Sequence, residues 1–368
     1  MKSEWKTIRA ADFMEFNPRM NLKKGTIATK ISMDKLQPYT KKIPETEQAE
    51  FSGGTKFSNG DTIMARITPC LENGKTAFVD CLNKDEVAFG STEFIVLRAK
   101  PGVSDAQFVY YLATSPEFRQ VAIKSMVGSS GRQRVQQPVL ENLELVVPEL
   151  PKQKRIGGFL AAIDDKIALN AKINDNLEKQ AQAIYCDMFI TNANPSWKIG
   201  YLSDLITVRY GKDHKKLTDG VYPVYGSGGI MRYVEKPLYD KESVLIPRKG
   251  TLNNVMYVNK PFWSVDTMFF TEMKLPNVAK FVFHFVKSKD LASLNAGSAV
   301  PSMTTDILNA MELPIPDADT LYKFENIIAP LYQAMQQNTQ ESGKLAEVRD
   351  SLLPRLMSGE IDVSAVHL

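Results

Sequence analysis

Apolar residues recur every three or four positions along a stretch of the sequence that begins after Pro151. This spacing predicts one long helix, and its persistence over about nine helical turns is typical of a coiled-coil seam. Asn170 lies on the same stripe, and Pro195 follows its end. The apolar members of the stripe are Ile156, Phe159, Ile163, Ile167, Ile173, Leu177, Ala181, Ile184 and Met188.

A second stripe keeps the register of the first at a distance of 168 residues. Asn338 falls at the equivalent of Asn170, and a polar residue inside an apolar seam often fixes its register. We therefore expect the two asparagines to form one layer; the alternative is that both face solvent. Pro354 should kink or end this helix, and Gly359 should stop it. The second stripe contains Phe324, Ile327, Leu331, Met335, Asn338, Leu345, Leu352 and Leu356.

Short apolar runs bounded by Gly, Asn or Pro occur outside these stripes and predict strands of a sheet. They are residues 62–65, 94–97, 243–246 and 268–270. Residues 105–124 and 277–294 have helical spacing instead. The parts of the chain outside the two long helices are therefore expected to mix helices and strands.

An internal repeat organises the chain. Residues 128–148 align without a gap with residues 296–316, at an offset of 168. Nearer the start of each copy, Trp5, Lys6 and Asp12 align with Trp197, Lys198 and Asp204, and residues 108–110 align with 281–283. The identical pairs in the gapless stretch are Ser130/Ser298, Leu140/Leu308, Glu144/Glu312, Leu145/Leu313 and Pro148/Pro316. The chain thus contains two copies of one unit, a globular segment followed by a helix, with boundaries at 1–148, 149–192, 193–316 and 317–368.

Charge changes this picture only slightly. The 368 residues carry a formal net charge of +3, and the four segments carry +3, 0, +4 and −4 in chain order. The modest positive charge of the two globular segments is compatible with nucleic-acid binding but does not by itself indicate it. Three cysteines and three histidines have no metal-ligand spacing. No apolar stretch is long enough to span a bilayer and the start lacks a signal-peptide pattern, so we expect a cytoplasmic protein without membrane contact.

Several motifs resemble the specificity subunits of type I restriction-modification systems. Residues 150–156 and 177–184 resemble the central conserved region of that family, and residues 352–361 resemble its distal conserved region. Residues 223–230, 248–250 and 261–267 follow in the order seen in its target recognition domains. The resemblance covers essentially the whole chain. The first domain departs most from the pattern, because it has residues 66–70 (RITPC) where the second has residues 248–250 (RKG).

The resemblance implies an α+β fold with two mixed α/β target recognition domains, 1–148 and 193–316, separated by two long antiparallel coiled-coil helices, 149–192 and 317–368. It implies a non-catalytic subunit that reads a bipartite, asymmetric site in double-stranded DNA, one half-site per domain. Two modification subunits carrying S-adenosylmethionine and restriction subunits would be its partners, with no cofactor in this chain.

The motifs of an enzyme are missing from the sequence. We find no GxxxxGK[ST] phosphate loop, no GxGxxG after a strand and no Asn/Asp-Pro-Pro-aromatic motif of amino-methyltransferases. Two alternatives stay open: a single-chain enzyme that modifies or cleaves DNA, and a coiled-coil structural adaptor that never touches DNA.

Candidate DNA contacts are side chains that suit phosphates or base edges. Each could instead belong to a solvated loop or a packed turn. In the first domain they are Arg66, Lys75, Ser129, Ser130, Arg132 and Arg134, and in the second Tyr225, Ser227, Arg248, Lys249 and Asn253. The predicted helix seam, which is also the candidate partner surface, comprises Ile156, Ile163, Ile167, Asn170, Leu177, Leu331, Asn338 and Leu345.

Overall fold

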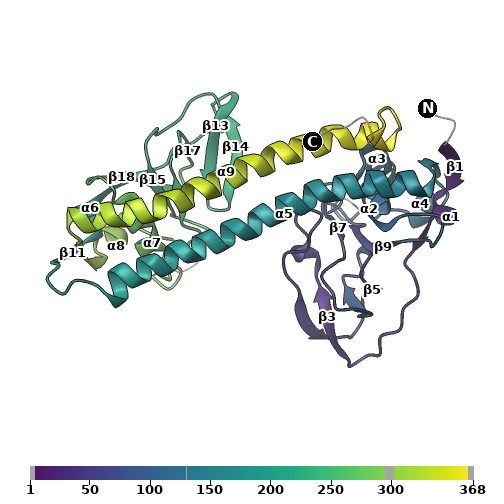
Figure 1. Cartoon of the computed structure of the whole chain (residues 1–368), viewed down its shortest axis with the longest axis horizontal. Helices are drawn as coiled ribbons and strands as arrows, with labels where there is room; N and C mark the ends of the chain where they lie inside the picture. Colours follow the sequence, from purple (N-terminus) through teal and green to yellow (C-terminus); the bar gives the residue numbers. More distant parts are fainter. Residues whose placement is uncertain (1–4, 130, 295–301, 364–368) are drawn as a thin grey trace. The chain divides into compact units, whose positions relative to one another are not determined.

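The computed structural model describes residues 5–129, 131–294 and 302–363 (Figure 1). The chain forms two compact units: unit 1 contains residues 1–172 and 338–368, and unit 2 contains residues 173–337. Two long helices, α5 (Leu150–Cys186) and α9 (Ala318–Met357), each contribute a piece to both units. No helix in the described ranges combines the length and the apolar character needed to cross a membrane.

Unit 1 contains two four-stranded sheets. The first has the order β2-β9-β6-β7 and is antiparallel throughout; the second has the order β4-β3-β8-β5, in which β3 and β8 are parallel. The strands of the first sheet are β2 (Met14–Phe16), β9 (Phe94–Ala99), β6 (Thr62–Ala65) and β7 (Thr76–Phe78). Those of the second are β4 (Glu47–Glu50), β3 (Ile27–Ile31), β8 (Ala88–Gly90) and β5 (Thr55–Phe57).

The first and last strands of this globular part pair with each other, β1 (Trp5–Arg9) antiparallel to β10 (Glu144–Pro148). The predicted helix over 105–124 is two helices, because the Ser115 side chain accepts a hydrogen bond from the Phe118 N–H and caps a new helix. The short helices of unit 1 are α1 (Ala10–Phe13), η1 (Met33–Lys35), α2 (Ala106–Thr114), α3 (Pro116–Lys124) and α4 (Gln137–Glu141).

Unit 2 repeats this plan. It has a four-stranded sheet of order β12-β18-β15-β16, a three-stranded sheet of order β14-β13-β17, and a closing pair of β11 with β19. The strands are β11 (Ile199–Tyr201), β12 (Ile206–Tyr210), β13 (Asp219–Gly226), β14 (Gly229–Val234), β15 (Ser243–Pro247), β16 (Met256–Val258), β17 (Trp263–Ser264), β18 (Met268–Met273) and β19 (Glu312–Pro314). The helices are η2 (Asp187–Thr191), α6 (Leu202–Leu205), α7 (Ala279–Lys287) and α8 (Thr305–Asn309).

Pieces of the two long helices lie side by side and run in opposite directions within each unit (Figure 1). In unit 1 the Asn170 side-chain amide donates to the Asn338 carbonyl at 3.3 Å. In unit 2 the Asn174 amide donates to the Met335 carbonyl at 3.1 Å. Asn170 is only 1% exposed, so the expected contact between the two asparagine positions is confirmed and the solvent-facing alternative is wrong for Asn170.

Two details of α9 differ from the sequence prediction. The helix passes through Pro354 to Met357, so Pro354 does not end it; packing of Leu353, Leu356 and Met357 in the unit 1 core offsets the lost backbone hydrogen bond. Gly359 does stop the helix, with a φ of +71°. Ile327, predicted in the seam, is 49% exposed.

The seam of α9 in unit 2 instead passes through Ile328, which is completely buried. Strict spacings of three and four from Leu321 and Phe324 lead to Ile328 and then to Leu331. Because Ile327 and Ile328 are adjacent, the register of the seam is ambiguous in the sequence. The structure shows that Ile328 is the buried residue.

A buried polar cluster occupies equivalent positions in the two units. In unit 1, Asp164 accepts hydrogen bonds from the Tyr111 hydroxyl and the Arg349 guanidinium, both at 2.5 Å. In unit 2, His284 bonds the Tyr332 hydroxyl at 3.0 Å and the Gln182 amide oxygen at 2.8 Å. Tyr111 aligns with His284, and Asp164 with Tyr332. Each cluster joins α5, α9 and the helix that follows the main sheet.

Candidate DNA interface

Arg66 and Arg134 lie together at one end of the main sheet of unit 1. Arg66 directly follows β6, and its carbonyl accepts a hydrogen bond from the Val135 N–H at 2.8 Å. Arg134 binds both oxygens of Glu93 through its guanidinium, at 2.7 to 3.0 Å. This bidentate pair lowers the pKa of the Glu93 carboxyl group. The result is a half-exposed arginine held in a fixed orientation beside a second arginine.

The remaining unit 1 candidates have different surroundings. Ser129 and Arg132 close an exposed turn, in which the Arg132 N–H donates to the Ser129 carbonyl at 3.0 Å. Within the described ranges the Arg132 guanidinium has no partner, so it is available to a ligand. Lys75 is instead engaged, because its ammonium donates to the Met33 carbonyl at 2.9 Å. Ser130 lies outside the described residues.

Arg248 occupies the corresponding place in unit 2, directly after β15. Its guanidinium donates to the Asp266 carbonyl at 3.0 Å and lies 5.4 Å from the centre of the Tyr210 ring. Its own carbonyl accepts from the Met303 N–H at 2.9 Å. Stacking on an aromatic face holds an arginine plane while leaving donors free.

Tyr210 was not found by sequence reasoning, although it is 53% exposed at the end of β12. Next to it, Gly211 packs so closely on the Val265 carbonyl that a Cβ would lie 2.0 Å from that oxygen. Lys212 follows, with its N–H bound to the Ser264 carbonyl and its side chain exposed. In the sequence, the only signal for Tyr210 was its position beside a basic run.

Lys249 and Ser227 lie beside the Arg248 turn. Lys249 is exposed and pairs with Ser302 through an isolated β-bridge. A Cβ at Gly250 would lie 2.7 Å from the Ser227 hydroxyl, and the Asn254 amide donates to the Ser227 carbonyl at 2.8 Å. The structure therefore brings these two candidates to the same turn as Arg248.

Asn253 and Tyr225 have structural roles. The Asn253 amide donates to Asp290 at 3.0 Å, and its amide oxygen accepts from the Ala292 N–H at 3.0 Å, so both ends are engaged. Tyr225 is 8% exposed, its ring packs edge-on against Phe262, and burial raises its pKa to about 12. The packed-turn alternative therefore describes the Tyr225 side chain, because Tyr225 lies in the part of β13 that is buried.

The two arginine sites are equivalent. Ile67 bridges Arg134 as Lys249 bridges Ser302, and the carbonyls of Arg66 and Arg248 accept from residues 135 and 303, which are 168 apart. Their neighbours differ: Arg66 lies near an acidic side chain and a second arginine, whereas Arg248 lies on a tyrosine. Two equivalent positions with different chemistry are suited to two different ligand sequences.

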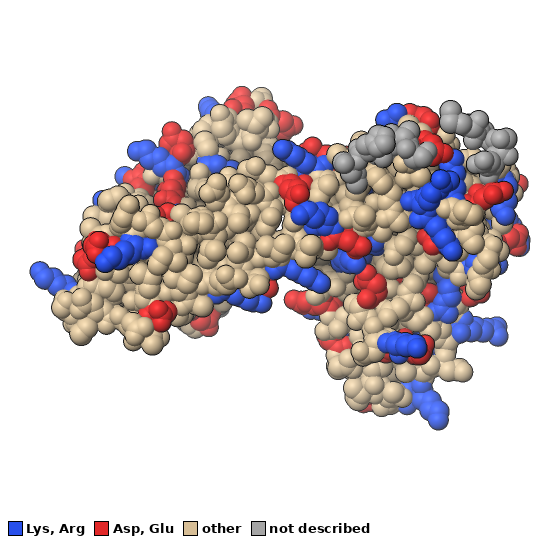
Figure 2. Space-filling model, in the orientation of Figure 1, with Lys and Arg blue, Asp and Glu red and all other residues tan. Residues whose placement is uncertain are grey.

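Acidic and basic side chains are intermixed on the face drawn in Figure 2. DNA contact on this face would depend on local groups rather than on a large uniform field. Within the described residues no group of three His, Cys, Asp or Glu side chains could hold a metal ion.

The predicted seam residues are buried to different degrees. Ile156, Ile163 and Asn170 are at most 1% exposed. The others, Ile167, Leu177, Leu331, Asn338 and Leu345, are intermediate. Leu169 and Ile173, which flank the middle of α5, are 51% and 38% exposed. Part of the apolar surface of α5 is therefore exposed to solvent.

The same plan therefore occurs twice in the chain, an α/β domain with its own closing strand pair and an arginine site, packed on the long helices. Residues 2–179 and 194–347 match the family described as the type I restriction modification DNA specificity domain. The chain therefore belongs to this family, as the resemblance in the sequence predicted, and its fold class is confirmed.

Similar proteins cover most of the chain. The type I restriction enzyme HindI specificity subunit of Haemophilus influenzae is 21% identical over 83% of this chain and 87% of its own length. The MjaVIII specificity subunit of Methanocaldococcus jannaschii is 19% identical over 99% of this chain and 94% of its own. The crystal structure of a type I system S subunit from M. genitalium has 18% identity, a TM-score of 0.61 and 96% coverage of both chains. At 18% identity, the similarity to this crystal structure shows a shared fold only.

Proposed function

We propose that this chain is the non-catalytic subunit that reads a bipartite, asymmetric sequence in double-stranded DNA. Each globular domain would read one half-site. The observation that supports this most is the equivalence of Arg66 and Arg248 in unlike surroundings. Duplicated positions that have kept an arginine but changed their neighbours fit two readers of one ligand class and different base sequences.

The chemistry of each site suits base edges and phosphates. In unit 1 the arginine held by a carboxylate is Arg134, which lies beside Arg66, and in unit 2 Arg248 lies on an aromatic ring. An arginine in such a site can present two donors to the O6 and N7 of guanine in the major groove. Arg132, Lys212 and Lys249 are exposed cations that suit phosphates, which position the protein without carrying sequence information. We assign base reading to the Arg66 and Arg248 sites and phosphate contact to these flanking cations.

Catalysis would come from partners. We propose that two modification subunits, each carrying S-adenosylmethionine, bind the paired helices, and that restriction subunits join them to cleave DNA. The half-exposed apolar residues of α5 and α9 supply surface for such binding. The helices would also set the distance between the half-sites.

Methylation mapping tests the proposal directly. DNA from cells that express this chain with its cognate modification subunit should carry methylated adenine in a two-part motif separated by a fixed gap. Omitting this chain should abolish the motif. Methylation without any motif, or with the same motif in its absence, would contradict the function.

Two further assays separate the alternatives. The purified chain should neither transfer label from S-adenosylmethionine to DNA nor cut plasmid in the presence of magnesium, and turnover in either assay would identify an enzyme. In a gel-shift assay the chain, with its modification subunits, should bind DNA with an affinity that falls as salt rises, because phosphate contacts release counterions. A structural adaptor would give no shift at any salt concentration.

A further inference from the structure

The hairpin formed by β13 and β14 in unit 2 exposes two neighbouring apolar side chains next to its turn. Ile230 is 46% exposed and Met231 is 61% exposed. Side chains of a regular strand alternate between its two faces, so one of two neighbours in a sheet packed on one side should be buried. A β-bulge breaks the alternation here, because the register shifts between Val224 and Tyr225 and skips Met231. Bulges redirect side chains, and this one leaves both apolar groups at the surface.

The Met231 side chain lies over the turn of the hairpin, beside the Arg248 site. A Cβ at Gly226 would lie 2.5 Å from the Met231 sulfur, so the glycine leaves the space that the thioether occupies. Ser227 follows in the turn, and a Cβ at Gly250 would lie 2.7 Å from its hydroxyl oxygen. The hairpin turn and the turn that carries Arg248 are therefore in contact. The apolar pair is continuous with the proposed DNA interface of unit 2.

Cations border the apolar pair. Lys249 is exposed in the neighbouring turn. The loop from β12 to β13 carries the exposed residues Lys212, Lys215 and Lys216, and its one acid, Asp213, accepts a hydrogen bond from the Lys215 N–H at 3.0 Å. This loop is held against the same sheet, because the Lys212 N–H donates to a β17 carbonyl at 2.8 Å. Apolar groups bordered by lysines suit a polyanion that also presents apolar groups, and the major groove of DNA combines phosphates with thymine methyl groups.

Unit 1 has no counterpart of this apolar pair. Its equivalent strands, β3 and β4, pair without a register shift and are joined by residues 32–46 in place of a two-residue turn. The two residues that lead into β4 are Glu45 and Thr46, and both are polar and exposed. An apolar element near the arginine site is therefore specific to unit 2.

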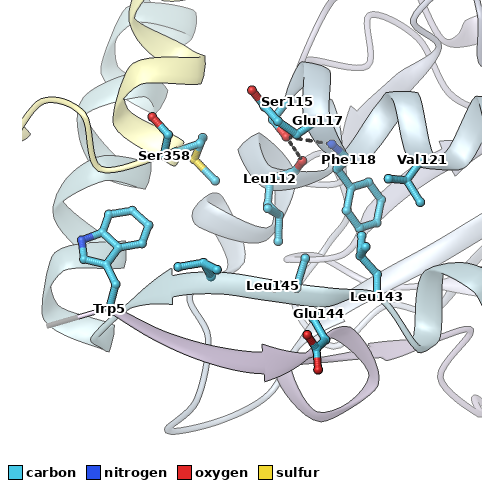
Figure 3. A pocket seen from close by; sticks show the side chains of 12 residues that line it. Trp5, Leu112, Ser115, Glu117, Phe118, Val121, Leu143, Glu144, Leu145 and Ser358 are labelled. Atoms are coloured by element: carbon cyan, nitrogen blue, oxygen red, sulfur yellow. Dashed lines mark hydrogen bonds between the residues drawn. The ribbon is translucent and has the colours of Figure 1, made fainter. Parts of the chain in front are cut away.

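Other surfaces are the same in both units. The apolar pocket of unit 1 in Figure 3 and a smaller pocket of unit 2 share three lining residues, in the pairs Trp5/Trp197, Glu144/Glu312 and Leu145/Leu313. A surface that both units share cannot distinguish one half-site from the other. A surface that only one unit has is expected where that unit meets something the other does not meet. In the proposed function this is the base sequence of its half-site, which favours DNA over a partner protein present in two copies.

We infer that Ile230 and Met231 contact the C5-methyl group of a thymine in the major groove, close to the base that Arg248 reads. The inference rests on the proposed function and adds a second reading element to unit 2. Thymine is distinguished from the other bases of DNA in this groove by its methyl group. The half-site of unit 2 should then contain a thymine recognised by its methyl group, whereas unit 1 reads its half-site without this contact.

Replacing thymine by deoxyuracil tests the contact directly, because it removes only the methyl group. The complex of this chain with its modification subunit is titrated with oligonucleotides in which each thymine of the recognised sequence, on either strand, is replaced in turn. The wild-type complex should lose about fourfold in affinity at a thymine of one half-site, which corresponds to ~0.8 kcal/mol for one buried methyl group at ~1.4 kcal/mol per tenfold. That half-site should be the one that Arg248→Ala alters.

Variants of the hairpin connect the effect to these side chains. Ile230→Ala and Met231→Ala should each reduce the preference for thymine over uracil at that position, and the double variant should bind both oligonucleotides equally. Ile199→Ala removes an apolar side chain that is 66% exposed in β11 of the same unit and should keep the wild-type preference.

Gly226→Ala tests the placement of Met231 without removing it. The added methyl group would meet only the flexible end of the Met231 side chain at close range, so the fold should tolerate the change. Displacing the thioether should reduce the preference for thymine as Met231→Ala does, while affinity for the uracil oligonucleotide is retained.

Several outcomes would overturn the inference and leave the proposed function intact, because the same assay measures specific binding to the bipartite sequence. They are a wild-type complex indifferent to every replacement, a thymine preference that persists in the double variant, and variants that lose affinity equally for thymine and uracil. The last outcome would indicate that the hairpin acts through packing or as a wedge. A wild-type complex without specific DNA binding would overturn the proposed function together with this inference.

Discussion

Arg66 and Arg248 follow equivalent strands of the two units, and each carbonyl accepts a hydrogen bond from the backbone of a later residue, Val135 at 2.8 Å and Met303 at 2.9 Å. The two backbones are thus fixed in the same way, while the guanidinium groups meet different neighbours. Substituting each arginine separately therefore tests the contribution of each domain by itself.

Arg66→Ala and Arg248→Ala should each relax recognition of one half-site only. Loss of a bidentate contact to guanine costs about 1–3 kcal/mol and is felt at one base position. Methylation assays on oligonucleotides with single changes in either half-site would measure this. Lys323→Ala, which removes an exposed cation from α9, is the control and should leave both half-sites unchanged. If Arg66→Ala altered the half-site that Arg248→Ala alters, the one-domain, one-half-site assignment would be wrong.

Lengthening both long helices should widen the gap of the recognised sequence. A heptad inserted after Lys172 and another after Gln337 keep the seam in register and add about 10.5 Å to each helix. At ~3.4 Å per base pair this corresponds to about three base pairs. Methylation mapping should therefore return the same half-sites with a longer gap. An active insertion variant with the original gap would show that the helices do not set the spacing.

Removing Asp164 should destabilise unit 1 strongly. Its carboxylate is 5% exposed and binds Arg349, whose side chain is 13% exposed. Asp164→Ala leaves the guanidinium with only the exposed carboxylate of Asp350, at 2.8 Å, and leaves the Tyr111 hydroxyl without its acceptor. We expect a cost of about 3 kcal/mol, the lower end of the range for a broken buried ion pair. Asp175→Ala breaks an exposed pair with Lys179 on the same helix and should change stability by less than about 0.5 kcal/mol. Denaturant unfolding followed by circular dichroism would compare them; similar midpoints would contradict the assigned role of the buried pair.

Acid should weaken unit 2 through His284. Burial, with repulsion from Lys287, lowers the pKa of the imidazole to about 4, against about 6.5 when unfolded. Because the unfolded chain binds this proton first, the contribution is complete above pH 6.5 and is lost progressively toward pH 4, up to about 3 kcal/mol.

The measurement is unfolding free energy as a function of pH for the wild-type chain and His284→Gln. The carboxylates contribute equally to both proteins, so the difference isolates the imidazole. The variant should show the shallower dependence between pH 4 and 6.5. Parallel curves would mean that His284 takes up its proton without a cost in the folded state.

Helical periodicity and the internal repeat predicted most of the fold, because both are properties of spacing that survive in a single sequence. Spacing alone was insufficient where a local hydrogen bond or core packing determines where a helix begins or ends. The Ser115 cap divides a predicted helix, and core packing carries α9 past Pro354. At residues 327 and 328 two apolar neighbours fit the stripe almost equally well, so the buried one had to come from the geometry.

The candidate site was predicted in part. Residue type and repeat position identified Arg66 and Arg248, which the structure places equivalently. Tyr210 was missed because a single exposed aromatic residue at a strand end leaves no periodic pattern. The Tyr225 side chain is buried and the Lys75 ammonium donates to a backbone carbonyl, and neither arrangement can be read from the sequence. Contact with DNA by each of the candidates stays a prediction.

The pairing of β1 with β10, and of β11 with β19, brings the entry and exit of each globular domain together in one short ladder. A segment whose two ends lie side by side can be replaced by another with the same end spacing, while the helices outside it keep their sequence and register. Each domain is in this sense an interchangeable cassette. If each domain reads one half-site, as proposed, exchange of one cassette would alter that half-site alone and leave the other domain and both long helices unchanged.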